Sequence, residues 1–407
     1  MRRITDLSYH RQNYFRRSNA AKKYFYFLPL VLTLQILLGI LTGCRSTDQT
    51  LHQTQSLILA SAENPTGFQK ALPPAKITFP EDFGPHPDFQ TEWWYYTGNL
   101  DTAEGRHFGY QLTFFRRALI PQTERVERNS NWGADQVYLA HFAITDVQAG
   151  THTVFEKSAR GALGLAGAQA EPYQVWLEDW SIRKISDRHY ALIARQDDYA
   201  LELQMVDTKG PVLQGKNGYS QKGPDPGNAS YYYSQTHLET EGKITVMGLE
   251  YTVSGLSWKD HEYSTSALSG DQVGWDWFAL QLDDGTEVKV YHIRKADGSI
   301  DNYSSGGYIS AEGTLTPLTN GSFEIIPQST WTSPVSGAEY PSGWLIQVPD
   351  LDISLQITPY LAYQELNVSY SYWEGAVRVQ GTKAGHRIGG SGYAELTGYA
   401  QSMAGEF

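Results

Sequence analysis

The chain of 407 residues is predicted to be an all-β protein. Aromatic residues make up 13% of it and glycine contributes 38 residues, whereas charged residues reach only 19%, below the usual quarter. From residue 76 onward, apolar and polar residues alternate and a period of 3.6 residues is rare. Aromatic, turn-rich sequence with a period of two is typical of many short antiparallel strands, which form barrels or sandwiches.

The individual strands are expected where this alternation is clearest. In the second half of the chain, the turns Asp283-Asp284-Gly285 and Ala296-Asp297-Gly298 separate expected strands, because glycine adopts the positive φ that tight hairpins require. The expected strands before residue 210 lie at 93–97, 108–114, 137–147 and 173–185, followed by a hairpin over 190–206.

The charge balance is acidic. Asp and Glu total 44 against 32 Lys and Arg, a net charge of −12. Seven of the basic residues and one acidic residue precede residue 44, so the remainder carries 25 against 43, or −18. Such a surface repels phosphate backbones, and we expect no nucleic-acid partner. The single cysteine, Cys44, excludes an internal disulfide and a multi-thiolate zinc site.

The first 43 residues are expected to form an export signal. Basic residues precede an apolar run over 24–41, which ends in Leu41-Thr42-Gly43-Cys44. This ending resembles a bacterial lipobox, which implies that Cys44 is lipidated and becomes the mature N-terminus. The alternative is an uncleaved membrane anchor, since about 18 apolar residues nearly span a bilayer. Both interpretations predict an exported protein held at a membrane, on the periplasmic or cell-surface side.

The rest of the chain is expected to comprise a tether and two β domains. Residues 44–75 are rich in Ser, Thr, Gln, Ala and Pro, as tethers are. Residues 211–236 are rich in Gly, Pro and Asn and predict a long loop over a cavity mouth. The lengths on either side of this loop predict one domain over 76–254 and another over 255–407.

Five motifs resemble those of the AttH-like and carotenoid 1,2-hydratase (hydroxyneurosporene synthase) family. The first is FQTEWWYYTG at 89–98, and the others are AHFAITD at 140–146, WKDHE at 258–262, YWEG at 372–375 and GYAELTGY at 392–399. The resemblance implies two lipocalin-like antiparallel β-barrel domains in tandem, with a ligand region near or between them. It also implies a hydratase that adds water to a terminal double bond of an acyclic carotenoid, although relatives include polyene cyclases and proteins without an assigned activity.

Asp276 is the expected proton donor. Period two places it beside Phe278, Leu280 and Leu282 on one apolar strand face. A carboxyl group in such surroundings either keeps a proton, which it could give to an alkene, or finds a hydrogen-bond partner. The alternative is therefore a structural aspartate that binds backbone amides at a strand end.

The segment from Trp258 to Tyr263 supplies the other expected catalytic residues. In a strand, Asp260 and Glu262 share one face, and His261 points to the other with Lys259 and Tyr263. We hypothesise that His261 assists the water molecule and that Asp260 orients it. The alternative is a polar network that fixes the join between the domains. Tyr263 departs from the family hydratases, which have Trp there.

The expected ligand-binding residues are aromatic or lie on apolar strand faces. Indoles and phenols stabilise a carbocation through cation–π attraction. For the histidines the alternative is a hydrogen-bonded core residue, and for Glu92 it is an ion pair with Arg116 or Arg117. These candidates are Glu92, Trp94, His141, Tyr263, Trp275, Trp277 and His292.

The sequence thus favours an exported, membrane-tethered hydratase that acts on an apolar polyene or isoprenoid, with no cofactor and no metal expected. Neither a Gly-x-Ser-x-Gly elbow nor a His-Glu-x-x-His motif occurs in the chain. The alternative is a lipocalin-like carrier of a lipid or pigment, because small β-barrels commonly hold one apolar ligand without chemistry.

Overall fold

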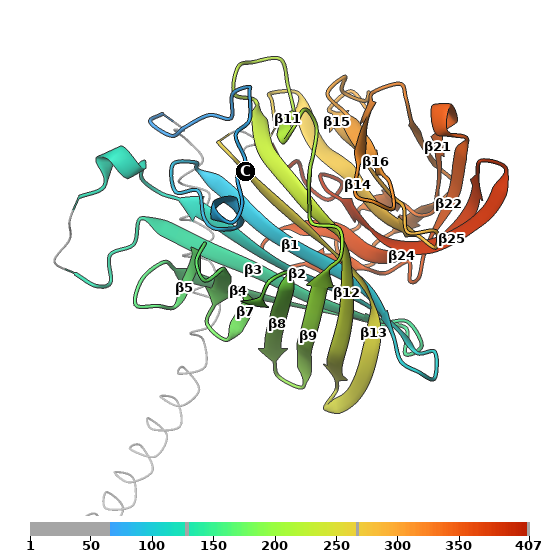
Figure 1. Cartoon of the computed structure of the whole chain (residues 1–407), viewed down its shortest axis with the longest axis horizontal. Helices are drawn as coiled ribbons and strands as arrows, with labels where there is room; N and C mark the ends of the chain where they lie inside the picture. Colours follow the sequence, from blue (N-terminus) through green and yellow to red (C-terminus); the bar gives the residue numbers. More distant parts are fainter. Residues whose placement is uncertain (1–65, 127–129, 266–267, 405–407) are drawn as a thin grey trace, which may run out of the picture. The chain divides into compact units, whose positions relative to one another are not determined.

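Two antiparallel β-sheets dominate the described chain, which confirms the predicted all-β fold (Figure 1). The computed structural model describes residues 66–126, 130–265 and 268–404. The N-terminal sheet contains β1 (Thr91–Asp101), β2 (His107–Ala118), β3 (Gln136–Asp146), β4 (Thr151–Arg160), β5 (Ala166–Gln169), β6 (Gln174–Leu177), β7 (Trp180–Ser186), β8 (His189–Gln196), β9 (Tyr199–Asp207), β10 (Pro211–Leu213), β11 (Tyr219–Gln221), β12 (Ala229–Val246) and β13 (Leu249–Ser264).

The C-terminal sheet contains β14 (Gln272–Leu282), β15 (Glu287–Lys295), β16 (Ser305–Ile309), β17 (Leu315–Thr319), β18 (Glu324–Pro327), β21 (Trp344–Val348), β22 (Ile353–Pro359), β23 (Glu365–Asn367), β24 (Ser371–Lys383) and β25 (His386–Leu396). A separate ladder joins β19 (Thr330–Thr332) to β20 (Glu339–Pro341). Short 3₁₀-helices span Glu81–Phe83, Gln122–Glu124 and Pro349–Leu351. Within the described ranges, no helix is both long enough and apolar enough to cross a bilayer.

The N-terminal sheet is a nearly closed barrel. Its strands follow the order β4-β3-β2-β1-β13-β12-β9-β8-β7-β6-β5, and the edge strand β4 approaches β6. Alternate residues, including Phe108, Phe142 and Trp180, fill the interior as one apolar core. The C-terminal sheet, ordered β17-β16-β15-β14-β25-β24-β22-β21-β18, encloses a second core that includes Phe278 and Trp344.

Three segment boundaries differ from those expected. β13 pairs with β1 as far as Ser264, so the N-terminal sheet continues past residue 254. Residues 211–236 form β10, β11 and the start of β12 rather than one long loop, because each of the short strands pairs with β12. The end of the expected tether packs on the body, where Ala71 is buried. Residues 1–65, with the expected signal peptide and Cys44, lie outside the described residues.

The two sheets pack against each other through a shared apolar cluster. Tyr95 and Trp258 of the N-terminal sheet join Trp277 and Tyr393 of the C-terminal sheet there. The backbones approach closely where β2 meets β24. A Cβ atom at Gly109 would lie 2.6 Å from the Cβ of Ala376, so glycine is required at this position.

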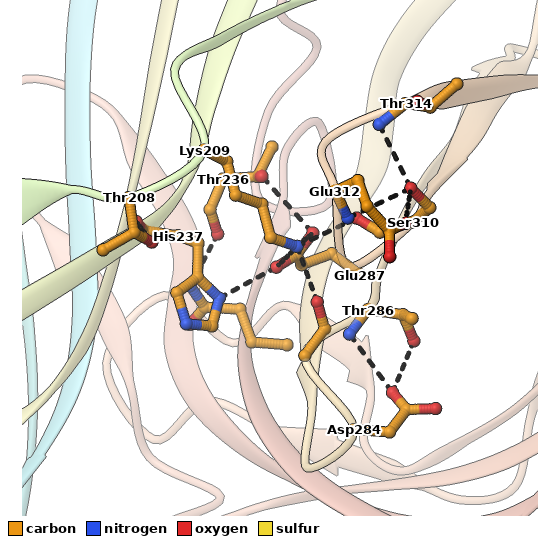
Figure 2. Close-up of polar contacts among 12 residues, drawn as sticks. Thr208, Lys209, Thr236, His237, Asp284, Thr286, Glu287, Ser310, Glu312 and Thr314 are labelled. Carbon is orange, nitrogen blue, oxygen red and sulfur yellow. Dashed lines mark hydrogen bonds and ion pairs between the residues drawn. The ribbon is translucent and has the colours of Figure 1, made fainter.

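A buried ion-pair cluster links the sheets at another point (Figure 2). Glu287 of β15 accepts hydrogen bonds from Lys209 Nζ at 2.6 and 2.7 Å and lies 2.9 Å from His237 Nδ1. Thr236 and His237 lie where the β12–β13 register shifts, and such irregularities re-aim side chains. Lys209 also donates to the carbonyls of Gly285 and Ser310, so every hydrogen of its ammonium group has an acceptor.

Lys209→Met should reduce the free energy of unfolding by about 3 kcal/mol, because it leaves the Glu287 carboxylate buried without its main counter-charge. Urea denaturation would measure the change. Lys243→Met is the matched control, since Lys243 and its partner Glu250 are 51% and 54% exposed. The control should lose less than about 1 kcal/mol. Equal losses in both variants would contradict a structural role for the Lys209–Glu287 pair.

Candidate functional site

The β13 segment presents opposite faces to two different environments, as period two predicts. Lys259, His261 and Tyr263 point into the N-terminal sheet, whereas Asp260 and Glu262 point toward the C-terminal sheet. His261 and Asp260 therefore do not act on the same water molecule, which corrects the pairing expected for them.

Glu92 is the centre of a buried polar network inside the N-terminal sheet. Its Oε1 lies 2.8 Å from His261 Nε2 and 2.7 Å from His86 Nδ1, and Arg116 Nε donates to Oε2 at 2.8 Å. A carboxylate oxygen only accepts, so both ring nitrogens carry a proton. His261 Nδ1 lies 2.9 Å from the hydroxyl of Tyr233. The ion pair expected between Glu92 and Arg116 is thus present.

Interactions between opposite charges offset the cost of burying the charged groups of this network. Burial opposes ionisation of Glu92, but Arg116 and His86 outweigh it and hold the pKa of Glu92 well below its usual range. Burial also opposes the charged form of His86, yet Glu92 and Asp82 raise its pKa. His261 has no second carboxylate to compensate, and burial lowers its pKa to about 4.

His86, Glu92 and His261 could also ligate a metal ion, because their ligand atoms lie within 4.8 Å of one another. In the structure each of these atoms is used in a hydrogen bond, and Arg116 neutralises the carboxylate. A divalent cation would have to replace two imidazole protons beside a guanidinium. The geometry therefore fits a closed hydrogen-bond network better than a metal centre.

Trp94 and Tyr263 belong to this network rather than to a cavity wall. The Trp94 ring stacks on His261 at 4.9 Å between ring centroids, and the Tyr263 ring stacks on His86 at 3.4 Å. Four expected ligand-site or catalytic residues thus lie together, but in packed surroundings. They are Glu92, Trp94, His261 and Tyr263.

Asp276 and His292 face the core of the C-terminal sheet. Arg294 Nε donates to Asp276 Oδ1 at 2.9 Å, and the hydroxyl of Tyr399 donates at 3.0 Å. Asp276 shares the face of Phe278, as expected, and burial raises its pKa against the opposing effect of Arg294 and Tyr399. The His292 ring stacks on Phe323 at 5.4 Å, and burial lowers the pKa of His292 to about 4.

A cavity of about 110 Å³ lies between the two sheets. Strands β1, β2, β3, β12 and β13 supply one wall, and β14, β15, β24 and β25 supply the other. Nine of the twenty residues that line the cavity are Phe, Trp or Tyr. Of the expected site residues, His141, Asp260, Trp275 and Trp277 line it, together with Trp93, Tyr95, Lys222, Tyr232, Glu262, Tyr291, Tyr372, Glu374 and Glu395.

Asp260 and His141 are held by hydrogen bonds at the cavity wall. Trp258 Nε1 donates to Asp260 at 2.7 Å, and Ser234 and Tyr232 donate through their hydroxyls. His141 spans the two sheets, since its Nδ1 lies 2.7 Å from the Tyr372 hydroxyl of β24.

Two carboxyl groups that the sequence analysis did not select meet at this cavity. Glu374 of β24 lies directly opposite Glu395 of β25 in the strand register. Among the described residues, neither carboxyl oxygen of Glu374 has a well-formed hydrogen bond; the hydroxyls of Tyr95 and Tyr372 lie near it and oppose part of the rise in its pKa. Trp275 Nε1 donates to Glu395 at 2.6 Å.

Burial and repulsion from neighbouring carboxylates keep a proton on this pair. Burial and the charge of Glu395 raise the pKa of Glu374 well above its usual range, and burial raises the pKa of Glu395 to about 7. A sequence signal was available, because Tyr372 and Glu374, and likewise Tyr393 and Glu395, alternate within the family motifs. Only the β24–β25 register shows that the two glutamates meet.

His86→Asn should destabilise the protein more at about pH 6 than at about pH 9. The folded-state pKa of His86 is raised, so its stabilisation is complete below the unfolded value of 6.5 and is lost as pH rises through the folded value. We expect a loss of about 1.5–3 kcal/mol at the lower pH, as for a hydrogen bond to a charged group.

Urea unfolding at both pH values would measure this difference. His189→Asn is the control, because the exposed His189 ring contacts the backbone carbonyl of Asp187. A loss of stability that is the same at both pH values for His86→Asn would show that His86 is not held as an imidazolium.

Comparisons with known proteins agree with this architecture. The family model described as AttH-like matches residues 70–399. A putative AttH protein from Nitrosomonas europaea is 35% identical, with a TM-score of 0.72, covering 82% of this chain and 100% of that one. Kievitone hydratase from Nectria haematococca is 14% identical, with a TM-score of 0.61 and coverage of 82% and 97%.

CghA bound to Sch210972 is 10% identical, with a TM-score of 0.52 and coverage of 84% and 96%. At their low identities, the kievitone hydratase and CghA structures show a common fold alone. No curated protein matches the chain. The family match and the Nitrosomonas structure, each covering most of the chain, show that the protein belongs to the AttH-like family.

Proposed function

We propose that the protein is a hydratase that adds water to a carbon–carbon double bond of an apolar isoprenoid or polyene. The observation that carries the proposal is the Glu374–Glu395 pair on the wall of an aromatic cavity. A carboxyl pair that retains a proton at neutral pH is suited to general acid catalysis. The pair takes the role first expected for Asp276, because Asp276 is bound to Arg294 outside this cavity.

The reaction follows from the groups that surround the cavity. The carboxyl pair transfers a proton to the less substituted alkene carbon, and a cation forms at the more substituted one. The rings of Trp93, Trp275 and Trp277 line the same space, where a good cation–π contact is worth about 0.5–2 kcal/mol. Water then bonds to the cation and releases a proton, which completes the hydration without a cofactor. Kievitone hydratase, which shares the fold, is named for a hydration.

The cavity volume restricts what enters it. At about 110 Å³ it is smaller than the roughly 150 Å³ cavity that accommodates benzene in another protein. We infer that the end group of an isoprenoid chain occupies the cavity and that the remainder of a long polyene lies outside it.

Glu374→Gln should abolish hydration, because an amide cannot donate the proton. The test is mass spectrometry of organic extracts from protein purified from a carotenoid-containing host grown in ¹⁸O-labelled water. Wild-type protein should yield a hydroxylated, ¹⁸O-labelled polyene, and the variant only the unmodified one.

Asp276→Asn is the matched control and should retain the labelled product, since Asp276 faces the other side of β14. Loss of product in Asp276→Asn with product retained in Glu374→Gln would return the role of acid to Asp276. An unmodified lipid or pigment from the wild-type protein would favour the second candidate function, a carrier, which the aromatic-rich lining also suits.

We further propose that the protein is exported and tethered to a membrane by lipidated Cys44, as the basic stretch, the apolar run and the lipobox-like ending suggest. Growth with a labelled fatty acid should label the wild-type protein and the control Ser46→Ala, whereas Cys44→Ser should remain unlabelled. Label on Cys44→Ser would contradict the lipoprotein assignment.

A further inference from the structure

Tyr291 occupies an unusual position on the cavity wall. It lies on the face of β15 that also carries Glu287 and Lys289, turned toward the N-terminal sheet, where β11 lies beside β15 (Figure 1). Its side chain is buried and its ring belongs to the apolar cluster between the sheets. The phenolic oxygen is nevertheless surrounded by polar groups from two separate segments.

Donors converge on this oxygen. The Ser305 hydroxyl of β16 donates to it at 2.7 Å, the Ser220 hydroxyl of β11 lies 3.3 Å away, and Lys222 Nζ lies 3.5 Å away. Hydrogen bonds from such donors favour the phenolate over the neutral phenol. The phenolate oxygen only accepts hydrogen bonds, whereas a phenol also needs an acceptor for its own proton.

Two ammonium groups flank the Tyr291 ring. Lys222 Nζ lies 4.5 Å and Lys289 Nζ 4.6 Å from the ring centroid. Both also approach Tyr232, at 5.4 and 4.2 Å. The cations are balanced on the β13 side by Asp260 and by Glu262, which lies 3.1 Å from Lys222.

The charges around Tyr291 distinguish it from the other tyrosines of the cavity. Burial raises the pKa of Tyr95, Tyr232 and Tyr372 well above the usual value. Burial acts on Tyr291 in the same direction, but Lys222, Lys289 and the two serine hydroxyls outweigh it and lower its pKa. The cavity therefore holds an acid pair and a phenol whose proton affinities are shifted in opposite directions, as in sites that combine a general acid with a general base.

We propose that Tyr291 is the general base of the cavity and takes the proton from the attacking water. The proposal rests on the hydratase function proposed above and adds a second catalytic residue to it. The carboxyl pair gives its proton to one alkene carbon, the water oxygen bonds to the other, and the Tyr291 phenolate takes the proton that water releases. The proton then returns through solvent from Tyr291 to the carboxylate, so that alkene plus water gives alcohol and the enzyme is restored.

The ionisation of Tyr291 can be tested without a substrate. The tyrosinate absorbance of wild-type protein minus that of Tyr291→Phe should show one group titrating below the ordinary value of about 10. Tyr95→Phe is the matched control, because burial raises the pKa of Tyr95 well above its usual value, and it should leave the absorbance below pH 10 unchanged. Lys289→Met should move the Tyr291 titration to higher pH by removing one flanking cation.

Catalysis is tested on the same variants with the ¹⁸O assay. Tyr291→Phe should reduce the labelled product by about 100-fold or more, the usual contribution of a general base. A titration at or above pH 10, or full product from a folded Tyr291→Phe, would overturn the proposal. If wild-type protein yields no hydrated product, the hydratase function fails instead, and the substrate-free titration still reports separately on Tyr291.

Discussion

Strand β1 and the second half of β13, residues 257–264, are buried on both faces, and the rest of the structure depends on this constraint. One face of each packs into the N-terminal barrel and the other against the C-terminal sheet. Because side chains alternate along a strand, neighbouring residues such as Asp260 and His261 enter separate environments. Each polar side chain in these buried stretches has lost contact with water, so it must find a partner or change its protonation state.

The two faces meet this requirement in different ways. Inside the barrel, Glu92 is compensated by Arg116 and two imidazoles, and the result is a closed network that fixes the fold. Between the sheets, Glu374 faces Glu395 across a strand pair and keeps a proton instead. Groups left unsatisfied beside an open cavity are the ones available for chemistry, whereas satisfied groups stabilise structure.

Sequence reasoning predicted strand faces well and their surroundings poorly. Alternation correctly separated Asp260 from His261 and placed Asp276 on the face of Phe278. It could not tell a barrel interior from an inter-sheet cavity, because both present apolar neighbours along the strand. Asp276 thus resembled a cavity acid although Arg294 binds it in a core. Glu374 and Glu395 were not predicted, because they lie in different strands and neither has another carboxylate next to it in the sequence.

The sequence by itself determined the all-β class, the family motifs and the alternation of strand faces, because local periodicity and turn residues encode these features. Only the tertiary structure decided which faces line the cavity and which acid meets which partner. The surroundings of Tyr291 show why: its phenolic oxygen meets Ser220, Lys222 and Ser305, which come from two segments distant in the sequence. The protonation of a buried group depends on charges a few ångströms away in space, and strand register and sheet packing set those distances.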